Sequence, residues 1–216
     1  MSKKLVVFLG PPGSGKGSIS QLCTQRLGFT QLSTGSICRK HVAQKSLIGQ
    51  QIDFSMKSGT LIPDELVTQM VCDWFARYEG DQPVILDGYP RTLAQADALT
   101  AFLQTAHPGF SLVVLKFAVS DETVMQRLAH RYVCVNTDCQ QVYAHEEQAV
   151  CVRCKAALSR RNDDRPETIK ERLKVYRSVE NDLFDFYARF GCMVDQIDVE
   201  RSIEAVFADI ERLVLG

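Results

Sequence analysis

A glycine-rich segment near the N-terminus, Gly10-Pro-Pro-Gly-Ser-Gly-Lys16, has the residue types and spacing that hold phosphate. The order G-x-x-x-x-G-K is the Walker A pattern, in which glycines allow successive backbone N–H groups to point at phosphate oxygens. An apolar run before it and a helical pattern after it favour this interpretation over a glycine-rich turn with an incidental lysine. We therefore predict an ATP or GTP site that includes Gly13, Ser14, Gly15, Lys16, Gly17 and Ser18.

Within this segment, Lys16 would reach the β- and γ-phosphates as a point charge. Ser18 supplies the hydroxyl, because Gly17 occupies the position directly after the lysine. A second candidate is Asp87, the carboxylate that ends the apolar run Val84-Ile-Leu. It would lie beside the glycine-rich loop and orient Mg²⁺ or its waters. The alternative for Asp87 is an acid that caps a turn, which Gly88 would suit.

Two close pairs of cysteines predict a metal site. Their spacing is C-x₄-C, then eleven residues, then C-x₂-C, and thiolates at these intervals can close a tetrahedral Zn²⁺ site. Such a site would be structural, since it leaves no open position for water or substrate. Four unmetallated thiols, or a variant in which Asp138 competes as a ligand, are the alternatives. The predicted ligands are Cys134, Cys139, Cys151 and Cys154.

The elements that must position these residues alternate between strands and helices. Apolar runs predict buried strands, and between them lie helical patterns. This alternation indicates an α/β fold, a P-loop doubly wound parallel sheet of about five strands with helices on both faces. The predicted strands are Leu5–Leu9, Gln31–Leu32, Val84–Leu86, Leu112–Phe117 and Met193–Ile197. The predicted helices are Ser18–Leu27, Asp64–Tyr78, Thr92–Thr105 and Ile203–Leu215.

Two segments interrupt the alternation and are interpreted as insertions on the core. Residues 34–63 are helical in pattern and longer than one crossover needs. Residues 127–165 hold the paired cysteines and little sustained apolar periodicity, as a zinc-ribbon-like insertion would. The predicted core then consists of residues 1–33, 64–126 and 166–216.

Composition restricts the class of protein. The chain has 216 residues, 45% hydrophobic and 24% charged, which is typical of a globular protein. No apolar run approaches the ~18–20 residues that span a bilayer, and the N-terminal residues do not resemble a secretory signal. We therefore expect a cytoplasmic protein without membrane association. A net charge of −1 argues weakly against a nucleic-acid binder. The unpaired cysteines, expected as free thiols, are Cys23, Cys38, Cys72 and Cys192.

From about residue 4 to residue 212 the sequence resembles the adenylate kinase family. GPPGSGKGS at 10–18 has the family form, including the displaced serine. The other matching blocks, in chain order, are LSTGSICR at 32–39, GTLIPD at 59–64, DGYPR at 87–91 followed by Gln95, RLAHR at 127–131, RRNDD at 160–164 and ERL at 171–173.

The resemblance implies phosphoryl transfer from MgATP to AMP, giving two ADP, by a monomer whose AMP-binding insertion is residues 34–63. Many members have a four-cysteine zinc lid, which here would be residues 127–165, although their first pair is usually C-x₂-C. Arg127 would lie against the ATP adenine. The implied catalytic residues are Lys16, Asp87, Arg91, Arg131, Arg161 and Arg172. The implied AMP-binding residues are Thr34, Gly35, Arg39, Gly59, Ile62, Gly88, Arg91, Gln95, Arg161 and Arg172, with Gln95 recognising the adenine.

The lysine and arginines that the resemblance implies are suited to phosphoryl transfer. Phosphoryl transfer asks a protein to position two nucleotides and to neutralise spreading negative charge. Arginine meets phosphate bidentately and remains charged. Each arginine alone could instead be a solvated charge on a helix face, since Arg127, Arg131 and Arg172 lie in helical patterns. The occurrence of these arginines together favours a role in binding the nucleotides over that of surface charges.

Four sites depart from the family pattern. Ser36 stands where the family usually has Asp, and Ile37-Cys38 replaces a common Leu pair. His130 replaces the usual Gly before the second lid arginine, which removes a flexible hinge position. Val199 follows Asp198 where Gly is usual.

Other functions stay open at this point. Kinases of UMP, CMP or GMP share the glycine-rich loop and the DGYPR-like block, but the long lid and the Thr34/Gln95 pair favour AMP. A nucleotide-binding switch without catalysis is disfavoured by the intact lysine and arginines. A zinc-ribbon nucleic-acid binder could use Arg153, Lys155, Arg160 and Arg161, but Tyr143 is the lone aromatic residue within the ribbon.

Overall fold

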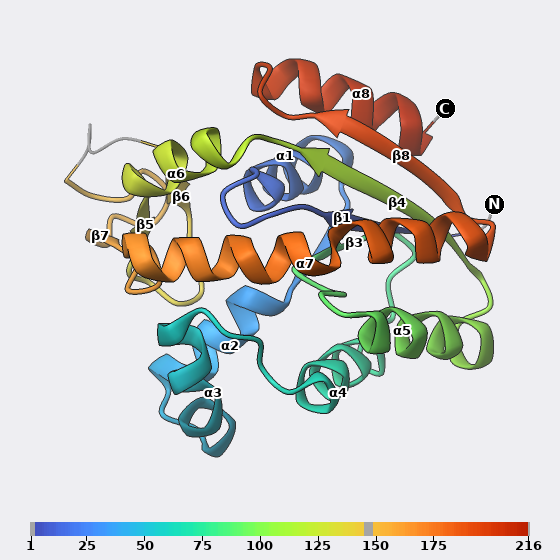
Figure 1. The fold of residues 1–216 in the computed structure, drawn as a ribbon, viewed down its shortest axis with the longest axis horizontal. Helices are drawn as coiled ribbons and strands as arrows, with labels where there is room; N and C mark the ends of the chain where they lie inside the picture. The colour runs from blue at the N-terminus through green and yellow to red at the C-terminus, as the bar shows by residue number, and fades with distance from the viewer. Residues whose placement is uncertain (1–2, 145–148, 216) are drawn as a thin grey trace.

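The computed structural model describes residues 3–144 and 149–215 and contains a five-stranded parallel sheet (Figure 1). The strand order is β2-β3-β1-β4-β8, so β1 lies at the centre. The strands agree with the predicted runs, extended by a few residues. They are β1 (Lys3–Leu9), β2 (Thr30–Ser33), β3 (Val84–Asp87), β4 (Phe110–Ala118) and β8 (Met193–Asp198).

Alternate residues of β1 face opposite sides of the sheet, and both sides are buried. Val6 and Phe8 belong to one apolar cluster, whereas Leu5, Val7 and Leu9 belong to the other. A strand whose side chains all enter apolar clusters must be apolar at every position. This explains the uninterrupted run in the sequence and confirms the prediction of a doubly wound sheet.

Helices cover both faces of the sheet. On one face lie α1 (Lys16–Leu27), α6 (Asp121–Ala129) and α8 (Ile203–Leu215), and on the other lie α4 (Asp64–Phe75) and α5 (Leu93–Ala106). The 25-residue helix α7 (Pro166–Phe190) contributes to both clusters and runs across the front of the view in Figure 1. Helices α6 and α7 were not delimited as separate helices from the sequence.

Residues 34–63 contain α2 (Thr34–Ala43) and α3 (Leu47–Ser58) and no strand. Ser33 and Ser46 cap the two helices, each accepting a hydrogen bond from the backbone N–H three residues later. The helices approach closely at Gly49, where an added Cβ would lie 2.1 Å from the carbonyl oxygen of His41. Only glycine fits that approach, so this pair of helices forms a compact unit.

A second, antiparallel sheet lies beside α6 and carries the paired cysteines. Its strands are β5 (Tyr132–Cys134), β6 (Val142–Tyr143) and β7 (Leu158–Arg160), in the order β6-β5-β7. The predicted lid range, 127–165, includes residues 145–148, which lie outside the described residues. Its predicted start at residue 127 falls within α6, which continues to Ala129. No described helix is long and apolar enough to cross a membrane.

Candidate active site and metal centre

Two adjoining cavities lie where β1, β2 and β3 end. The larger has a volume of about 1260 Å³ and the smaller about 70 Å³. Every residue predicted to bind nucleotide lines one or both of them. The shared boundary is lined by Gly35, Arg39, Gly59, Leu61, Gly88, Arg91 and Arg172. Ligands of doubly wound folds bind at this carboxyl edge of the strands.

The glycine-rich loop curls between β1 and α1 as the sequence predicts. Gly13 and Gly15 have φ of 78° and 91°, and Gly15 is the N-cap of α1. An added Cβ at Gly13 would lie 2.8 Å from Cγ of Leu128. Backbone N–H groups at a helix N-terminus favour an anion, so the loop can hold phosphate in the larger cavity.

The Lys16 ammonium is enclosed by its own loop. Its Nζ donates to the carbonyl oxygens of Gly10 and Pro11 at 2.7 and 2.8 Å, and to Oγ of Ser14 at 3.1 Å. Burial lowers the pKa of Lys16 from 10.5 to about 7, although the negative charge of Asp87 opposes that shift. A phosphate in the loop would supply the counter-charge that the buried ammonium lacks.

Asp87 lies opposite the start of α1. Gln31 Nε2 and Ser33 Oγ, both from β2, each donate to its Oδ2 at 3.4 Å, and Gly17 faces the same oxygen. The neighbouring strand therefore orients the carboxylate toward the loop. A carboxylate beside a phosphate site is the donor type that Mg²⁺ prefers, so Asp87 fits the predicted metal role.

The cluster of arginines comes from segments far apart in the chain. Arg131 pairs with Asp164 through Nε at 2.8 Å, and Arg172 pairs with Asp163 at 2.9 Å. Arg131 follows the end of α6, so the prediction that it lies within a helix was wrong. His130 is the C-cap of α6, and its negative φ of −108° does not require the usual glycine.

Arg161 differs from these two, because its buried Nε has no hydrogen-bond partner among the described residues. Burial, followed by the positive charges of Arg39 and Arg131, lowers its pKa well below the usual value. A buried guanidinium nitrogen without a partner is costly unless an acceptor binds there. The arrangement therefore favours an anionic ligand.

The charge of the larger cavity supports the same conclusion. Among the described residues, its carboxylates are Asp87 and Asp138. Its cations are Lys16, Arg39, Lys40, Arg91, Arg127, Arg131, Arg153, Arg161, Arg172 and Arg201. A cavity of this size and charge can accept polyphosphate chains.

The smaller cavity is framed by hydrogen bonds around the cis Tyr89–Pro90 turn. Thr34 Oγ1 donates to the carbonyl oxygen of Gly88 at 2.9 Å, and Arg91 Nε donates to the same oxygen at 2.8 Å. The Gln95 amide accepts from the Arg91 N–H at 2.7 Å and donates to Asp64 at 2.8 Å. Gln95 is buried, and its amide orientation is fixed on both sides.

In the lining of the larger cavity, Arg127 Nη2 donates to the carbonyl oxygen of Val199 at 2.7 Å. Val199 is buried and its N–H donates to the carbonyl oxygen of Ala118 at 3.1 Å. Val199, which stands where the family usually has glycine, is therefore accommodated at the end of β4. Arg127 and Val199 both line the larger cavity and neither lines the smaller one.

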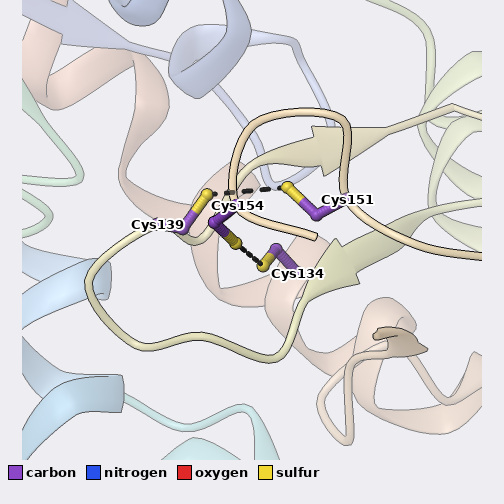
Figure 2. A group of neighbouring side chains, drawn as sticks. All are labelled: Cys134, Cys139, Cys151 and Cys154. Carbon is purple, nitrogen blue, oxygen red and sulfur yellow. Dashed lines mark hydrogen bonds between the residues drawn. The ribbon is translucent and has the colours of Figure 1, made fainter. Parts of the chain in front are cut away.

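The four predicted cysteines converge in the small sheet (Figure 2), with their sulfurs all within 4.8 Å of one another. The Cys134–Cys154 and Cys139–Cys151 sulfur pairs are 3.3 and 3.7 Å apart. Zn²⁺ with ~2.3 Å bonds to four thiolates separates the sulfurs by about 3.8 Å, so this set fits a closed tetrahedral site.

A hydrogen bond from a neighbouring residue supports the same fit. The Tyr143 hydroxyl donates to Sγ of Cys151 at 3.2 Å, and this bond is the main cause that lowers the pKa of Cys151 to about 6. The Tyr143 oxygen in turn accepts from the Val152 N–H at 3.0 Å. Partners outside the ligand set that orient a thiolate are typical of metal sites. Asp138 is not in the cluster, because its carboxylate pairs with Lys40 at 2.7 Å.

The contacts between the cysteine-bearing segment and α2 were not predicted from the sequence. Arg39 Nε donates to Oε1 of Gln140 at 2.8 Å, in addition to the Lys40–Asp138 pair. These residues are about a hundred positions apart, so no local pattern connects them. The longer C-x₄-C loop was the available signal, since it places extra residues before Cys139.

The doubly wound sheet, the Walker A loop and the arginine-lined cavities define a P-loop nucleotide phosphotransferase. The sequence model of the adenylate kinase family matches residues 8–192. An adenylate kinase of Archaeoglobus fulgidus is 35% identical over 97% of each chain, and one of Thermotoga maritima is 36% identical over 97% of this chain and 96% of its own. The chain therefore belongs to the adenylate kinase family, and its activity is that of an adenylate kinase.

Proposed function

We propose that MgATP binds in the larger cavity and AMP in the smaller one, so that their phosphates meet at the shared boundary. The observation that carries this proposal is the convergence of Arg39, Arg91 and Arg172 on that boundary. Arginines that reach both cavities could hold an acceptor phosphate in line with a donor phosphate.

On the donor side, the loop N–H groups and Lys16 hold the phosphates, and Arg127 lies against the adenine beside Val199. Asp87 would hold the Mg²⁺ of the nucleotide, which neutralises phosphate charge when bound. Arg131 and Arg161 approach the transferring group from the lid side. None of these residues acts as a general base, because the acceptor is a phosphate oxygen that is already ionised.

On the acceptor side, Thr34, Gly59, Ile62 and Gly88 line the pocket of the AMP base and ribose, while Arg39 and Arg91 hold its phosphate. Gln95 would recognise the adenine. Its amide is held by Arg91 and Asp64 in this structure, so recognition would require exchange of one of these hydrogen bonds for the base.

Closure of two units over the nucleotides would exclude water and protect ATP from hydrolysis. The units are residues 34–63 and residues 127–165, moving against the core. The Cys₄ set would hold structural Zn²⁺ in the second unit. We further propose that the protein is monomeric and cytoplasmic, with its eight cysteines as free thiols or metal ligands in a reducing compartment.

The test is ADP formation from MgATP, measured in parallel with AMP, UMP, CMP and GMP as acceptors. Transfer confined to AMP is expected. A preference for another monophosphate would leave the fold and the arginine cluster intact, but it would contradict the assignment of Thr34 and Gln95 to AMP.

A further inference from the structure

The loop before β6 reaches across the larger cavity to α2. Gln140 accepts a hydrogen bond from Arg39 Nε at 2.8 Å and donates through Nε2 to the carbonyl oxygens of Ser36 and Thr137 at 3.3 and 2.9 Å. One amide therefore joins the first cysteine turn to both the side chain and the backbone of the opposite helix.

The backbone at Gln140 is unfavourable for a residue with a side chain. Its φ is 46°, in the left-handed region that glycine adopts without cost. The second cysteine turn has the same geometry, since Lys155 directly follows Cys154 and has φ of 63°. The Lys155 side chain is exposed and makes no hydrogen bond or ion pair among the described residues. Strained positions that persist are often functional, and here only Gln140 has a contact that accounts for its side chain.

Arg39 depends on neighbours to hold its orientation. Its Nη2 donates to Oγ of Ser36 at 3.2 Å, and an added Cβ at Gly35 would lie 3.1 Å from Nη1. With Nε occupied by Gln140, the guanidinium lies along the first turn of α2. Its side-chain hydrogen bonds to other side chains are with Ser36 and Gln140, and neither carries a charge that would compete with a phosphate.

We propose that Gln140 is a positioning residue, which fixes Arg39 for the acceptor phosphate when the lid lies against α2. This inference rests on the proposed role of Arg39 in binding AMP. The exposed Lys40–Asp138 ion pair lies beside the contact and adds little energy by itself. The Gln140 hydrogen bond to a charged partner is the stronger link, and it couples lid closure to the AMP site.

The test compares Gln140→Gly with Lys155→Gly. Glycine suits the backbone at both positions, so zinc content and Tm are expected to match those of the unchanged protein. The KM for AMP at saturating MgATP is expected to rise about tenfold in Gln140→Gly, a ratio that corresponds to about 1.4 kcal/mol. The KM for ATP is expected to change by less than about twofold, and Lys155→Gly to change neither constant.

The Arg39→Ala variant separates this inference from the proposed function. If Arg39→Ala raises the KM for AMP and Gln140→Gly does not, the positioning role is wrong and the AMP site stands. If Arg39→Ala has no effect on that KM, the AMP assignment of Arg39 fails, and the role of Gln140 fails with it.

The double variant Arg39→Ala/Gln140→Gly tests the route of the effect. A KM for AMP equal to that of Arg39→Ala alone is expected, because Gln140 acts through Arg39. If the two substitutions raised the KM for AMP independently, so that their effects multiplied in the double variant, the inference would be overturned. A rise in the KM for AMP in Lys155→Gly equal to that in Gln140→Gly would also overturn it.

Discussion

At the scale of single residues, Lys16 has the most informative environment. Its ammonium is surrounded by loop carbonyls and buried, and its pKa is lowered to about 7. Because an unfolded chain binds this proton up to pH 10.5, Lys16 destabilises the folded protein below about pH 7, and its contribution improves as pH rises from 7 to 10.5. A bound phosphate would stabilise the charged ammonium of Lys16 and so oppose the lowering of its pKa.

We predict that ATP binding at about pH 8.5 takes up close to one proton through Lys16, and that uptake is smaller near pH 6, where Lys16 is already charged. Calorimetric titration in two buffers of different ionisation enthalpy measures the uptake. Lys16→Met removes the titrating group and is expected to abolish the uptake through this residue. Equal uptake at pH 8.5 in both proteins would contradict the prediction.

Arg91 allows catalysis to be separated from stability. Its side chain is exposed and donates a hydrogen bond to the Gly88 carbonyl, so Arg91→Ala leaves no buried carboxylate without a partner. We expect kcat/KM to fall about 10²–10³-fold, as when a charge-stabilising donor is removed, with a nearly unchanged Tm. Steady-state kinetics and thermal melting check this.

Arg189→Ala, at an exposed position of α7, is the matched control and should change neither quantity. Normal turnover in Arg91→Ala would remove Arg91 from the proposed site. Arg131→Ala is a less useful probe, because it leaves the nearly buried Asp164 with a weakened set of partners.

At the scale of elements, the small sheet depends on its cysteines. Strands β5, β6 and β7 have two or three residues each, and few of their side chains are buried. So short a sheet buries too little apolar surface to order itself. A Cys₄ metal site would replace the missing core by joining the two turns.

We therefore predict that a zinc chelator lowers Tm and that Cys151→Ser lowers both Tm and zinc content. Cys192→Ser, outside the cluster, is the control and should retain the metal. Metal analysis and thermal melting provide the measurements. Equal melting temperatures with and without bound metal would show that the cysteine cluster does not stabilise the lid.

At the scale of the whole molecule, charge is distributed unevenly. The chain has a net charge of −1, yet the charged residues that line its larger cavity are ten cations and two carboxylates among the described residues. The opposite charges lie elsewhere, in exposed pairs such as Arg26–Glu204. An overall charge near zero therefore gives no indication of the field that a nucleotide meets on approach.

We predict that the KM values for ATP and AMP rise as salt increases from about 0.05 to about 0.5 M, because the Debye length shortens from ~14 to ~4 Å. Initial rates in KCl, with free Mg²⁺ held constant, measure the effect. Sucrose at matched osmolality is the control. KM values independent of salt would mean that the cavity cations act only through short contacts.

Local features allowed the sequence alone to predict much of the fold and part of the site. The Walker A loop was predictable because its glycines, lysine and following helix are adjacent in the chain. The buried strands were predictable because both faces of the sheet require apolar side chains, as in β1. The cysteine cluster was predictable because each pair spans one turn. The arginines of the site were predicted from the resemblance to the family, because their spacing alone did not distinguish them from surface charges.

Only the tertiary structure decided which distant residues meet. Arg39 and Gln140 are 101 positions apart, and their contact depends on the placement of α2 against the first cysteine turn. The Gln95 amide is held by Asp64 and by the Arg91 backbone, and Arg131 lies beyond the end of α6. Such contacts depend on the packing of many residues at once, whereas glycine turns, apolar runs and cysteine pairs depend on the residues beside them.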